Sequence, residues 1–239
     1  MMLSHPGAIY TRIPAADPEL VAEAGRYAIA DLHEALGSVA GRMALMSPRM
    51  RPTAPGHRIV GQAVTAYNFP GDNLMIHKAL QLAQAGQVLV LTNGGGQHGA
   101  LWGDVAGTFA KKKGIAGIVV DGPARDIDEL RAMELPVWAT SISPSHPQKR
   151  GPGAVNVPVV CDGVLVNPGD IIAADGDGVL VIPREHLQAV VEGARARSAK
   201  EAEIRRRVGA GESLFDILGM QKLIDAAGIP ERDEVWPGA

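Results

Sequence analysis

Two short segments carry the residue types best suited to chemistry. The first is Gly103–Asp104, and the second is Asp121–Asp126, which reads Asp-Gly-Pro-Ala-Arg-Asp. Each follows an apolar run typical of a central strand, so parallel pairing would place both segments at the same edge of a sheet, where α/β proteins bind ligands. Asp104 and Asp126 would then lie close together beside Arg125. Two facing carboxylates repel each other unless a cation or a shared proton intervenes.

A hard divalent cation would relieve this repulsion. Mg²⁺ prefers oxygen ligands and keeps several of its waters, so one carboxylate could bind it directly while the other holds a bound water. Arg125 adds a planar fork for a substrate carboxylate or a developing enolate oxygen. The alternative is structural, because Asp104 and Asp126 each begin a predicted helix, and Asp is a common N-cap. The two roles are compatible, since a capping carboxylate keeps a free oxygen.

Other patterns offer less specific chemistry. Gly94, Gly96 and Gly99 spell G-x-G-x-x-G after a buried strand, which is a dinucleotide fingerprint when the last glycine opens a helix. Here the loop continues to Gly103 before the next predicted helix, so a dinucleotide site is not favoured. The glycines are better explained by a flexible loop whose backbone approaches its neighbours closely, or by another anion bound through the loop amides. His77 has no partner at metal-ligand spacing and is not expected to bind zinc.

The elements around these segments predict an α/β fold with a mixed sheet. Strands are expected at Arg58–Asn68, Gln87–Thr92, Ile115–Val120, Pro136–Thr140, Val157–Val166 and, around a turn at Asp175–Gly178, Asp170–Ile182. Helices are expected at Asp17–Gly37, Asp72–Gly86, Asp104–Lys113, Asp126–Met133 and Arg184–Val208, followed by a second short helix, with loops at Ser47–Gly56 and Ser143–Gly153. The middle strand–helix–strand section favours parallel pairing with right-handed crossovers, and the later strands favour antiparallel pairing. We therefore expect one domain over residues 1–239 with helical extensions at both ends, the C-terminal one from about residue 184.

Composition excludes several classes of protein. The chain has 239 residues, a net charge of −3 and 4% aromatic residues, which argues against a nucleic-acid-binding face. No apolar run approaches the roughly 18 residues of a membrane span, and the first 14 residues lack the pattern of a secretory signal. The single cysteine, Cys161, cannot form an internal disulfide. These features predict a cytoplasmic protein without nucleic-acid or membrane partners.

The segments that contain these candidate residues also resemble those of a known protein family. With LWGD at Leu101–Asp104 and DGPARD at Asp121–Asp126, the sequence resembles the RraA-like family, and within it the class II pyruvate aldolases acting on 4-hydroxy-4-methyl-2-oxoglutarate and 4-carboxy-4-hydroxy-2-oxoadipate. Further matching segments are His33–Gly37, Pro70–Asn73, Leu135–Trp138, Val155–Val179 and Lys200–Arg207. The resemblance implies a swivelling β/β/α fold, and homotrimers or homohexamers with active sites between subunits. It implies retro-aldol cleavage of a 2-oxo acid to pyruvate, with oxaloacetate decarboxylation as a side activity.

The resemblance also implies roles for particular residues. Asp126 would ligate Mg²⁺ or Mn²⁺ directly, and Asp104 would orient a metal-bound water. Arg125 would contact the pyruvyl oxygen. Beyond Gly103, the amides of Val105 and Ala106 would hold the pyruvyl carboxylate. An acidic residue of the C-terminal helix would enter a neighbouring subunit's site, with Glu201 the best match and Glu203 the second. Glu34, on the first predicted helix, would be a further partner.

Three other functions are compatible with the resemblance. Some relatives inhibit an RNA-degrading endonuclease by contacting it, but these are shorter and lack the C-terminal helical extension. A dedicated oxaloacetate decarboxylase would use the same enolate chemistry. A demethylmenaquinone methyltransferase would need a methyl-donor site, for which the sequence offers only the glycines of residues 94–99. The intact Arg125–Asp126 pair favours the aldolase.

Overall fold

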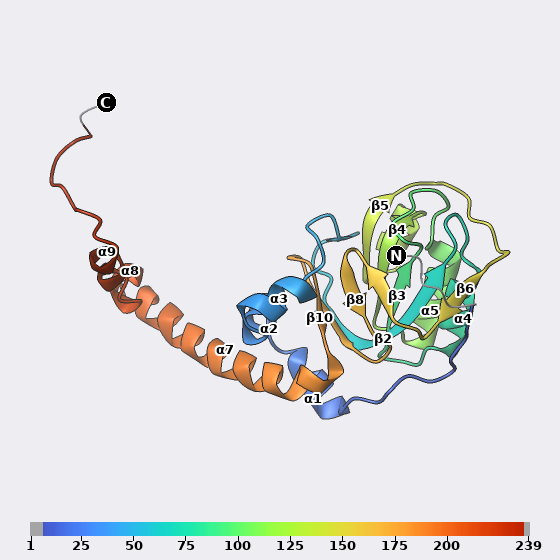
Figure 1. Ribbon diagram of the computed structural model, residues 1–239, viewed down its shortest axis with the longest axis horizontal. Helices are drawn as coiled ribbons and strands as arrows, with labels where there is room; N and C mark the ends of the chain where they lie inside the picture. The colour runs from blue at the N-terminus through green and yellow to red at the C-terminus, as the bar shows by residue number, and fades with distance from the viewer. Residues whose placement is uncertain (1–6, 237–239) are drawn as a thin grey trace. The chain divides into compact units, whose positions relative to one another are not determined.

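The computed structural model describes residues 7–236, shown as a ribbon in Figure 1. The chain forms two compact units, one ending at Arg195 and one beginning at Ala196. The single domain expected over residues 1–239 stays a prediction. The first six residues, part of the stretch read for a signal sequence, lie outside the described range. No helix within that range is long and apolar enough to cross a lipid bilayer.

The first unit is built on a mixed β-sheet with the strand order β1-β5-β4-β3-β2-β9-β10, with β6 also paired to β2. Its strands are β1 (Arg51–Pro52), β2 (Ile59–Asn68), β3 (Val88–Thr92), β4 (Gly117–Ala124), β5 (Val137–Ile142), β6 (Gly153–Val155), β9 (Ile171–Ala174) and β10 (Val179–Ile182). Strands β3, β4 and β5 run parallel, as predicted for the middle section of the chain, and β2 is also parallel to β3. Strands β1, β6, β9 and β10 are antiparallel to their neighbours. The α/β class with a mixed sheet is confirmed.

The central strands are buried on both faces, which explains their continuous apolar sequence. In β3, Leu89 and Leu91 face one apolar cluster, whereas Val88 and Val90 face another. A two-stranded hairpin, β7 (Val159–Cys161) with β8 (Val164–Val166), contributes to the second cluster (Figure 1). Each face of the parallel strands is therefore closed by apolar packing, and the strand ends remain for a polar site.

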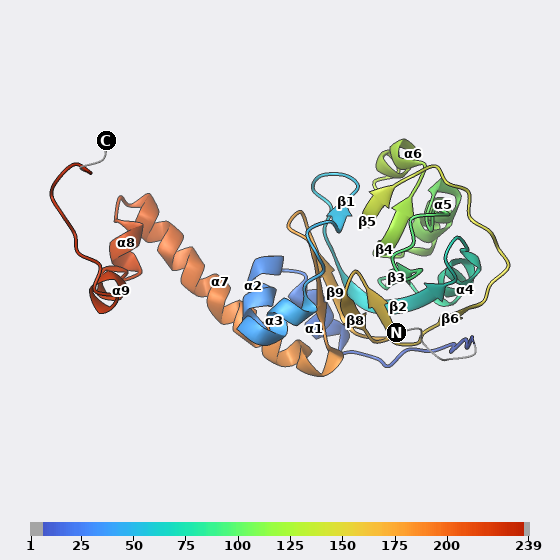
Figure 2. The ribbon, with the colours of Figure 1, turned by 45° about the horizontal axis from the view of Figure 1, so that its top comes forward.

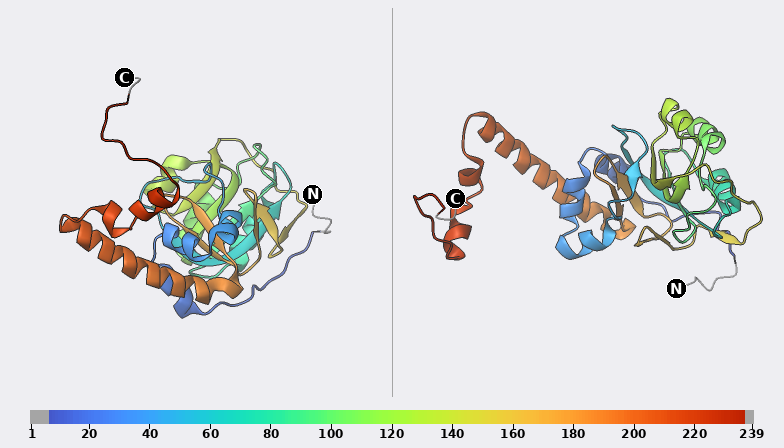
Figure 3. Two further views of the ribbon diagram at one scale, coloured as in Figure 1. Left: turned by 60° about the vertical axis from the view of Figure 1, so that its left-hand side comes forward. Right: turned by 90° about the horizontal axis from the view of Figure 1, so that it is seen from above.

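Two groups of helices pack against the sheet. The helices of the first unit are α1 (Pro18–Ala24), α2 (Ile29–Ala35), α3 (Ser38–Ala44), α4 (Leu74–Leu82), α5 (Asp104–Lys113) and α6 (Ile127–Ala132). Helices α4, α5 and α6 contribute buried side chains to the cluster that contains Leu89, and Figure 2 shows α5 and α6 beside β4 and β5. Helices α1 and α2, with the start of α7 (Leu187–Gly209), pack on β9 and β10. Figure 3 shows α2 and α3 next to each other.

The single helix expected over Asp17–Gly37 is wrong. Asp17 does cap α1, accepting from the Glu19 amide at 2.9 Å, but the helix ends at Ala24. Glycine is a poor helix former, and Gly25 caps α1 instead of continuing it. Helix α2 then restarts where the Ile29 amide donates to the Asp175 carboxylate at 3.3 Å, a contact supplied by the β9–β10 turn.

Several strand boundaries also differ from expectation. Val157–Val166 is a hairpin rather than one strand, because Asp162 and Gly163 both adopt positive φ, 45° and 84°, as a two-residue hairpin turn requires. Strand β4 runs beyond Val120 to Ala124, with a shift of register between Val120 and Pro123. Strands β1 and β6, as well as α3, lie where no element was expected.

The second unit contains most of α7, followed by α8 (Leu214–Ile217) and α9 (Gln221–Ala226). Glu201 pairs with Arg197 at 2.9 Å and with Arg205 at 2.6 Å, each one helical turn away. Glu203 pairs with Arg206 at 2.7 Å. These ion pairs lie on one helix at the i,i+4 and i,i+3 spacings at which side chains on a helix surface are neighbours.

Candidate active site

Asp104, Arg125 and Asp126 meet where helix α5 begins. The segment before α5 lies along the end of β4, since the Leu101 amide donates to the Pro123 carbonyl at 2.8 Å and the Arg125 amide donates to the Trp102 carbonyl at 2.9 Å. These two hydrogen bonds carry Gly103–Asp104 alongside Arg125–Asp126. The juxtaposition expected from parallel strands is therefore achieved by direct backbone pairing.

The Asp126 carboxylate links the two segments. Its Oδ2 accepts from Nε of Arg125 at 3.1 Å and from the backbone N–H of Asp104 at 3.3 Å. Asp126 is the N-cap residue of α6, but its side chain makes no capping bond there, and its backbone is left-handed with φ of 53°. The expectation that Asp126 caps its own helix is wrong, because its carboxylate is turned toward the first residue of α5.

Asp104 is the first helical residue of α5, and Gly103 is the N-cap. The prediction that Asp104 is the N-cap is therefore wrong by one residue. Its Oδ1 accepts from the adjacent Val105 amide at 2.7 Å. The first bond within the helix is donated by Gly107 to Gly103, so the Ala106 amide is one of the donors that a helix start leaves without an intrahelical partner.

Glycine is required at position 103 by close approach. A Cβ at this residue would lie 2.5 Å from Asp126 Oδ2 and 3.2 Å from both Cγ and Nε of Arg125. The backbone of Gly103 is extended, with φ of −160°, so conformation does not demand glycine here. The Gly-Asp sequence thus allows the Arg125–Asp126 pair to pack directly against the backbone.

A cavity of about 220 Å³ opens at this point. Its lining residues include the predicted Gly103, Asp104, Val105, Ala106 and Arg125. They also include residues that the sequence analysis did not assign to a site, namely Asn73, His77, Ala100, Leu101, Trp102, Pro147 and Lys149. Loop and helix segments far apart in sequence supply these groups, and no local spacing signals their convergence.

The predicted acidic partners are not among the residues that line this cavity. Glu34 lies on α2 and does not line this cavity. Glu201 and Glu203 lie on α7 in the second unit, and each is held there by arginine side chains. Asp121, placed with the site by sequence spacing, faces away from it: its carboxylate contacts Arg49 at 3.4 Å and Thr92 Oγ1 at 3.3 Å. Alternation along β4 explains this, since Asp121 follows Val120 and points to the opposite face.

The carboxylates fit an open divalent-cation site rather than a closed cage. No group of three or more His, Cys, Asp or Glu side chains suited to a metal occurs within residues 7–236. Asp126 is 31% exposed at its side chain and engages only one carboxylate oxygen in the bonds described above. Mg²⁺ is commonly held by one or two carboxylates together with waters and substrate oxygens. Asp126 and Asp104 offer that kind of donor set.

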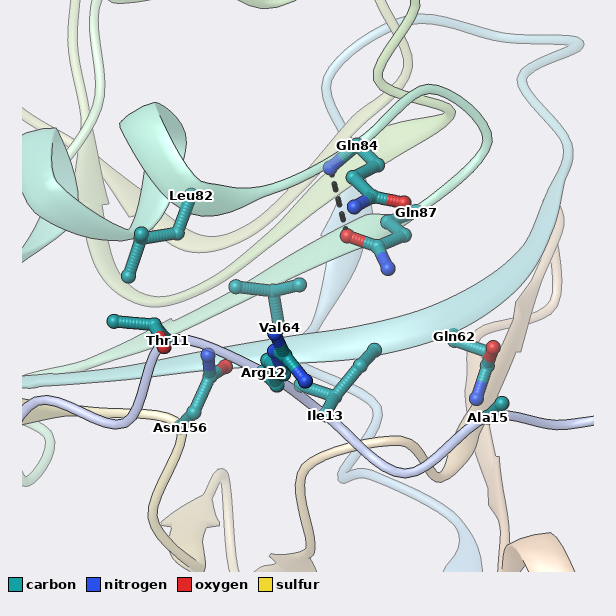
Figure 4. Close-up of a pocket in the computed structure, with 10 residues that line it drawn as sticks. All are labelled: Thr11, Arg12, Ile13, Ala15, Gln62, Val64, Leu82, Gln84, Gln87 and Asn156. Carbon is teal, nitrogen blue, oxygen red and sulfur yellow. Dashed lines mark hydrogen bonds between the residues drawn. The ribbon is translucent and has the colours of Figure 1, made fainter.

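Two other features of the first unit do not belong to this site. Figure 4 shows a separate cavity of about 310 Å³, lined by Arg12 and several amide side chains, with no Asp, Glu or His among its lining residues. Gly99, the last glycine of the glycine-rich loop, packs closely against the backbone, since a Cβ on it would lie 2.8 Å from Cα of Gly71. Helix α5 begins at Asp104 and not at Gly99, which removes the geometry on which a dinucleotide fingerprint depends.

Comparison with known proteins gives a consistent match. The family model described as "RraA-like: Aldolase/RraA" matches residues 29–181. A curated protein of Halalkalibacterium halodurans, "Putative 4-hydroxy-4-methyl-2-oxoglutarate aldolase", is 37% identical over 162 residues, which cover 68% of this chain and 77% of that protein.

Two solved structures share the fold. A Pseudomonas syringae pv. tomato protein, described as uncharacterized, aligns with a TM-score of 0.76 at 30% identity over 85% of this chain and 98% of that one. Streptomyces coelicolor RraAS2, described as an unusual member of the RNase ES inhibitor RraA protein family, aligns with a TM-score of 0.73 at 31% identity over 81% of this chain and 100% of that one.

Proposed function

Because the chain belongs to the RraA-like family, we propose that it is a divalent-metal-dependent class II pyruvate aldolase. The reaction is retro-aldol cleavage of a 4-hydroxy-2-oxo acid into pyruvate and a second 2-oxo acid. The proposed substrates are 4-hydroxy-4-methyl-2-oxoglutarate and 4-carboxy-4-hydroxy-2-oxoadipate. The name of the Halalkalibacterium halodurans relative supports this substrate class.

One observation carries the proposal: Arg125, Asp126 and Asp104 converge where helix α5 begins and a small cavity opens. Cleavage of the C3–C4 bond leaves negative charge on the pyruvate enolate oxygen. The Arg125 guanidinium supplies a fixed positive charge for that oxygen, and such preorganised charge stabilises a transition state strongly. Asp126 holds Arg125 through Nε and so fixes the direction of its remaining N–H groups.

The proposed reaction also uses a divalent metal ion. Asp126, with Asp104 nearby, would hold Mg²⁺ or Mn²⁺, and the bound ion would supply Lewis-acid stabilisation of the enolate. Asp104 is the carboxylate that lines the cavity, and we assign it to the water that accepts the proton from the C4 hydroxyl. The Asp104 carboxylate uses one oxygen for Val105, and an ionised carboxylate has further acceptor sites for a water.

The start of α5 suits the pyruvyl carboxylate. Backbone N–H groups and the helix dipole favour an anion at this position. The Ala106 amide is available there, whereas the Val105 amide donates to Asp104 Oδ1 at 2.7 Å. Use of the Val105 amide by the substrate would therefore require the Asp104 side chain to turn away from it.

We further propose that a second copy of the chain completes the site in a homotrimer or homohexamer. The acidic side chain is assigned to Glu201, with Glu203 as the second choice and Glu34 as a further partner. Glu201 is held between Arg197 and Arg205, so it is already oriented on α7. Light scattering coupled to size-exclusion chromatography measures the assembly, and a monomer at assay concentration would contradict this part of the proposal.

The experiment is release of pyruvate, coupled to lactate dehydrogenase, from both aldol substrates and from oxaloacetate. It is run with Mg²⁺, with EDTA and with Asp126→Ala. Release from an aldol substrate that requires the metal and is lost in the variant supports the aldolase. Release from oxaloacetate alone points to a decarboxylase, which shares the enolate. A folded protein that releases no pyruvate contradicts both.

A regulator of a ribonuclease is the second candidate, and the likeness to Streptomyces coelicolor RraAS2 favours it. This function would need a protein-binding surface and not the carboxylates of the cavity. Binding to an RNase E-type endonuclease that survives Asp126→Ala, together with absence of pyruvate release, would support the regulator over the aldolase.

A further inference from the structure

A second cavity in the first unit has a polar lining and is separate from the proposed active site. Its volume is about 310 Å³, within the range of roughly 300–1,000 Å³ typical of pockets that hold small molecules. It shares no lining residue with the cavity at the start of α5. Residues 11–15, which precede the region matched by the family model, form one side of it (Figure 4). The cavity therefore depends on this chain's own N-terminal segment.

Two amide side chains hold the N-terminal segment in place. Nδ2 of Asn156 donates to the Tyr10 carbonyl at 2.8 Å. Nε2 of Gln62 donates to the Pro14 carbonyl at 2.9 Å. These two hydrogen bonds lie on either side of Arg12 in the sequence, so they hold the backbone of Arg12 beside the cavity.

The same bonds decide which group each amide side chain can offer to a ligand. An amide side chain has one acceptor oxygen and one nitrogen that donates. Because Asn156 and Gln62 use their nitrogens on backbone carbonyls, they offer their oxygens. Oε1 of Gln87 accepts the backbone N–H of Gln84 at 2.7 Å, so Gln87 offers its nitrogen. The lining thus presents acceptors and donors together, and a hydroxyl group, which both donates and accepts, suits such a set.

Oδ1 of Asn156 calls most clearly for a ligand. Asn156 is 7% exposed, and this oxygen is buried without a hydrogen-bond partner among residues 7–236. Buried polar groups are normally hydrogen-bonded. Figure 4 shows the Asn156 amide directed toward Thr11 and Arg12. A hydroxyl group of a ligand in the cavity would supply the donor that this oxygen lacks.

The charge of the lining favours an anion with a single negative group. Among the residues that line this cavity within the described range, Arg12 alone is charged. A guanidinium can bind a carboxylate through two parallel hydrogen bonds. A phosphate monoester carries a charge of about −1.5 to −2 at pH 7, which one arginine does not balance. An ammonium group would find no carboxylate among these lining residues.

We propose that this cavity binds a polyhydroxylated monocarboxylate, the kind of acid that oxidation of a sugar produces. Its carboxylate pairs with Arg12, while its hydroxyl groups donate to Asn156 Oδ1 and accept from Gln87 Nε2. The apolar side chains that border its carbon chain are Ile13, Val64 and Leu82. This site is independent of the proposed aldolase, because no residue at the start of α5 takes part in it.

Three six-carbon molecules separate the parts of this recognition. Gluconate has hydroxyl groups and a carboxylate, sorbitol has hydroxyl groups alone, and hexanoate has a carboxylate alone. Calorimetry on the full chain, with EDTA present to remove metal ions, measures each dissociation constant. We expect one gluconate to bind per chain, at least about tenfold more tightly than sorbitol or hexanoate, the effect of one charge-assisted hydrogen bond. Absence of gluconate binding, or equal affinity for gluconate and sorbitol, overturns the site.

Arg12→Met should abolish the preference for gluconate over sorbitol, and Arg12→Lys should keep part of it. Arg12 is exposed, so neither variant should disturb folding. Arg42→Met is the matched control, because Arg42 is an exposed arginine of α3 that does not line the cavity. It should leave the preference unchanged. A preference that survives Arg12→Met overturns the site.

Asn156→Gly tests the buried oxygen. The Asn156 backbone has φ of 55°, which glycine adopts readily, and a melting curve checks that the variant is folded. We expect it to bind gluconate about tenfold more weakly. Asp126→Ala, which removes the proposed metal ligand, should leave gluconate affinity unchanged. An affinity that falls in Asp126→Ala but not in Asn156→Gly would place gluconate at the start of α5 and overturn the second site.

Discussion

Asp126 Oδ2 lies 3.3 Å from the backbone nitrogen of Asp104, and the same oxygen lies 3.1 Å from Nε of Arg125. One carboxylate oxygen therefore joins the end of β4 to the start of α5. Because these bonds use Oδ2, the other oxygen can be directed at a cation. The arrangement explains how a residue can be structurally fixed and still be the proposed metal ligand.

Asp126→Asn should separate these two roles. Asparagine tolerates the left-handed backbone at this position and keeps an oxygen acceptor for the Asp104 amide, but it loses the negative charge. We expect Mg²⁺-dependent pyruvate release to fall by at least about 100-fold, the scale on which one charge-stabilising group acts. The melting temperature should change little. Asp128→Asn is the control, because the Asp128 side chain is exposed and pairs with that of Arg131; undiminished release by Asp126→Asn would rule out Asp126 as the ligand.

Arg125→Lys should impair turnover although it keeps the charge. Lysine lacks the planar fork that lets Arg125 bond to Asp126 through Nε while presenting other N–H groups. We expect kcat to fall by about 10²–10³-fold, as for loss of a donor to a developing oxyanion. Steady-state kinetics with both aldol substrates measure this, and an unchanged kcat with a raised KM would instead assign Arg125 to uniform substrate binding.

Gly103→Ala should disturb the site through one methyl group. The new Cβ would lie 2.5 Å from Asp126 Oδ2, so either the carboxylate or the backbone must move. Overpacking of this kind costs about 1–3 kcal/mol of the free energy of unfolding, and we expect activity to fall more than stability. Gly176→Ala is the control, since a Cβ there meets no atom within 4 Å. Urea unfolding and pyruvate release on both variants provide the comparison, and a fully active Gly103→Ala would show that the close packing is dispensable.

The sequence predicts the parallel core and the meeting of Asp104, Arg125 and Asp126 for a physical reason. Continuous apolar runs specify strands buried on both faces, and residues that follow parallel strands gather at one edge. The Asp162–Gly163 pair between two apolar runs signals a two-residue hairpin turn. The apolar character of Val157–Val166 favours a single strand instead, and so the two signals conflict.

The other residues that line the cavity are not predictable in this way. Lys149 lies in a Pro- and Gly-rich loop without periodicity, and Asp72 accepts the amides of the two residues that follow it. Asp121 is a residue that the sequence wrongly assigns to the site, because it is close to Arg125 in sequence. Alternation along β4 instead turns its carboxylate toward Arg49.

Cys161 should be unreactive in the native protein. It is fully buried, and burial followed by the nearby Asp121 and Asp162 carboxylates raises the pKa of its thiol. The thiolate is the reactive form, so the native protein should react with an aromatic disulfide reagent at pH 8 only at the rate of its unfolding. Because the folded-state pKa is raised, this group's contribution to stability is present below the unfolded-state pKa and is lost as the pH rises toward the folded-state value. Rapid labelling at pH 8 without denaturant would contradict this burial.

Asp72 should stabilise the loop that carries Lys149. Its side chain is buried at a residue exposure of 2%, and its carboxylate accepts the amides of Leu74, Arg150 and Gly151. Asp72→Ala would leave these donors without their acceptor, which costs about 1–3 kcal/mol for a buried group. We expect a lower urea midpoint and faster hydrogen exchange at the Arg150 and Gly151 amides.

Asp72→Asn tests the same interaction with less change of shape, because it keeps one acceptor oxygen while losing the charge. Its exchange rates at Arg150 and Gly151 should lie between those of the wild-type protein and Asp72→Ala. Slow exchange at both amides in Asp72→Ala would show that other contacts hold the loop, and Asp72 would then have no positioning role.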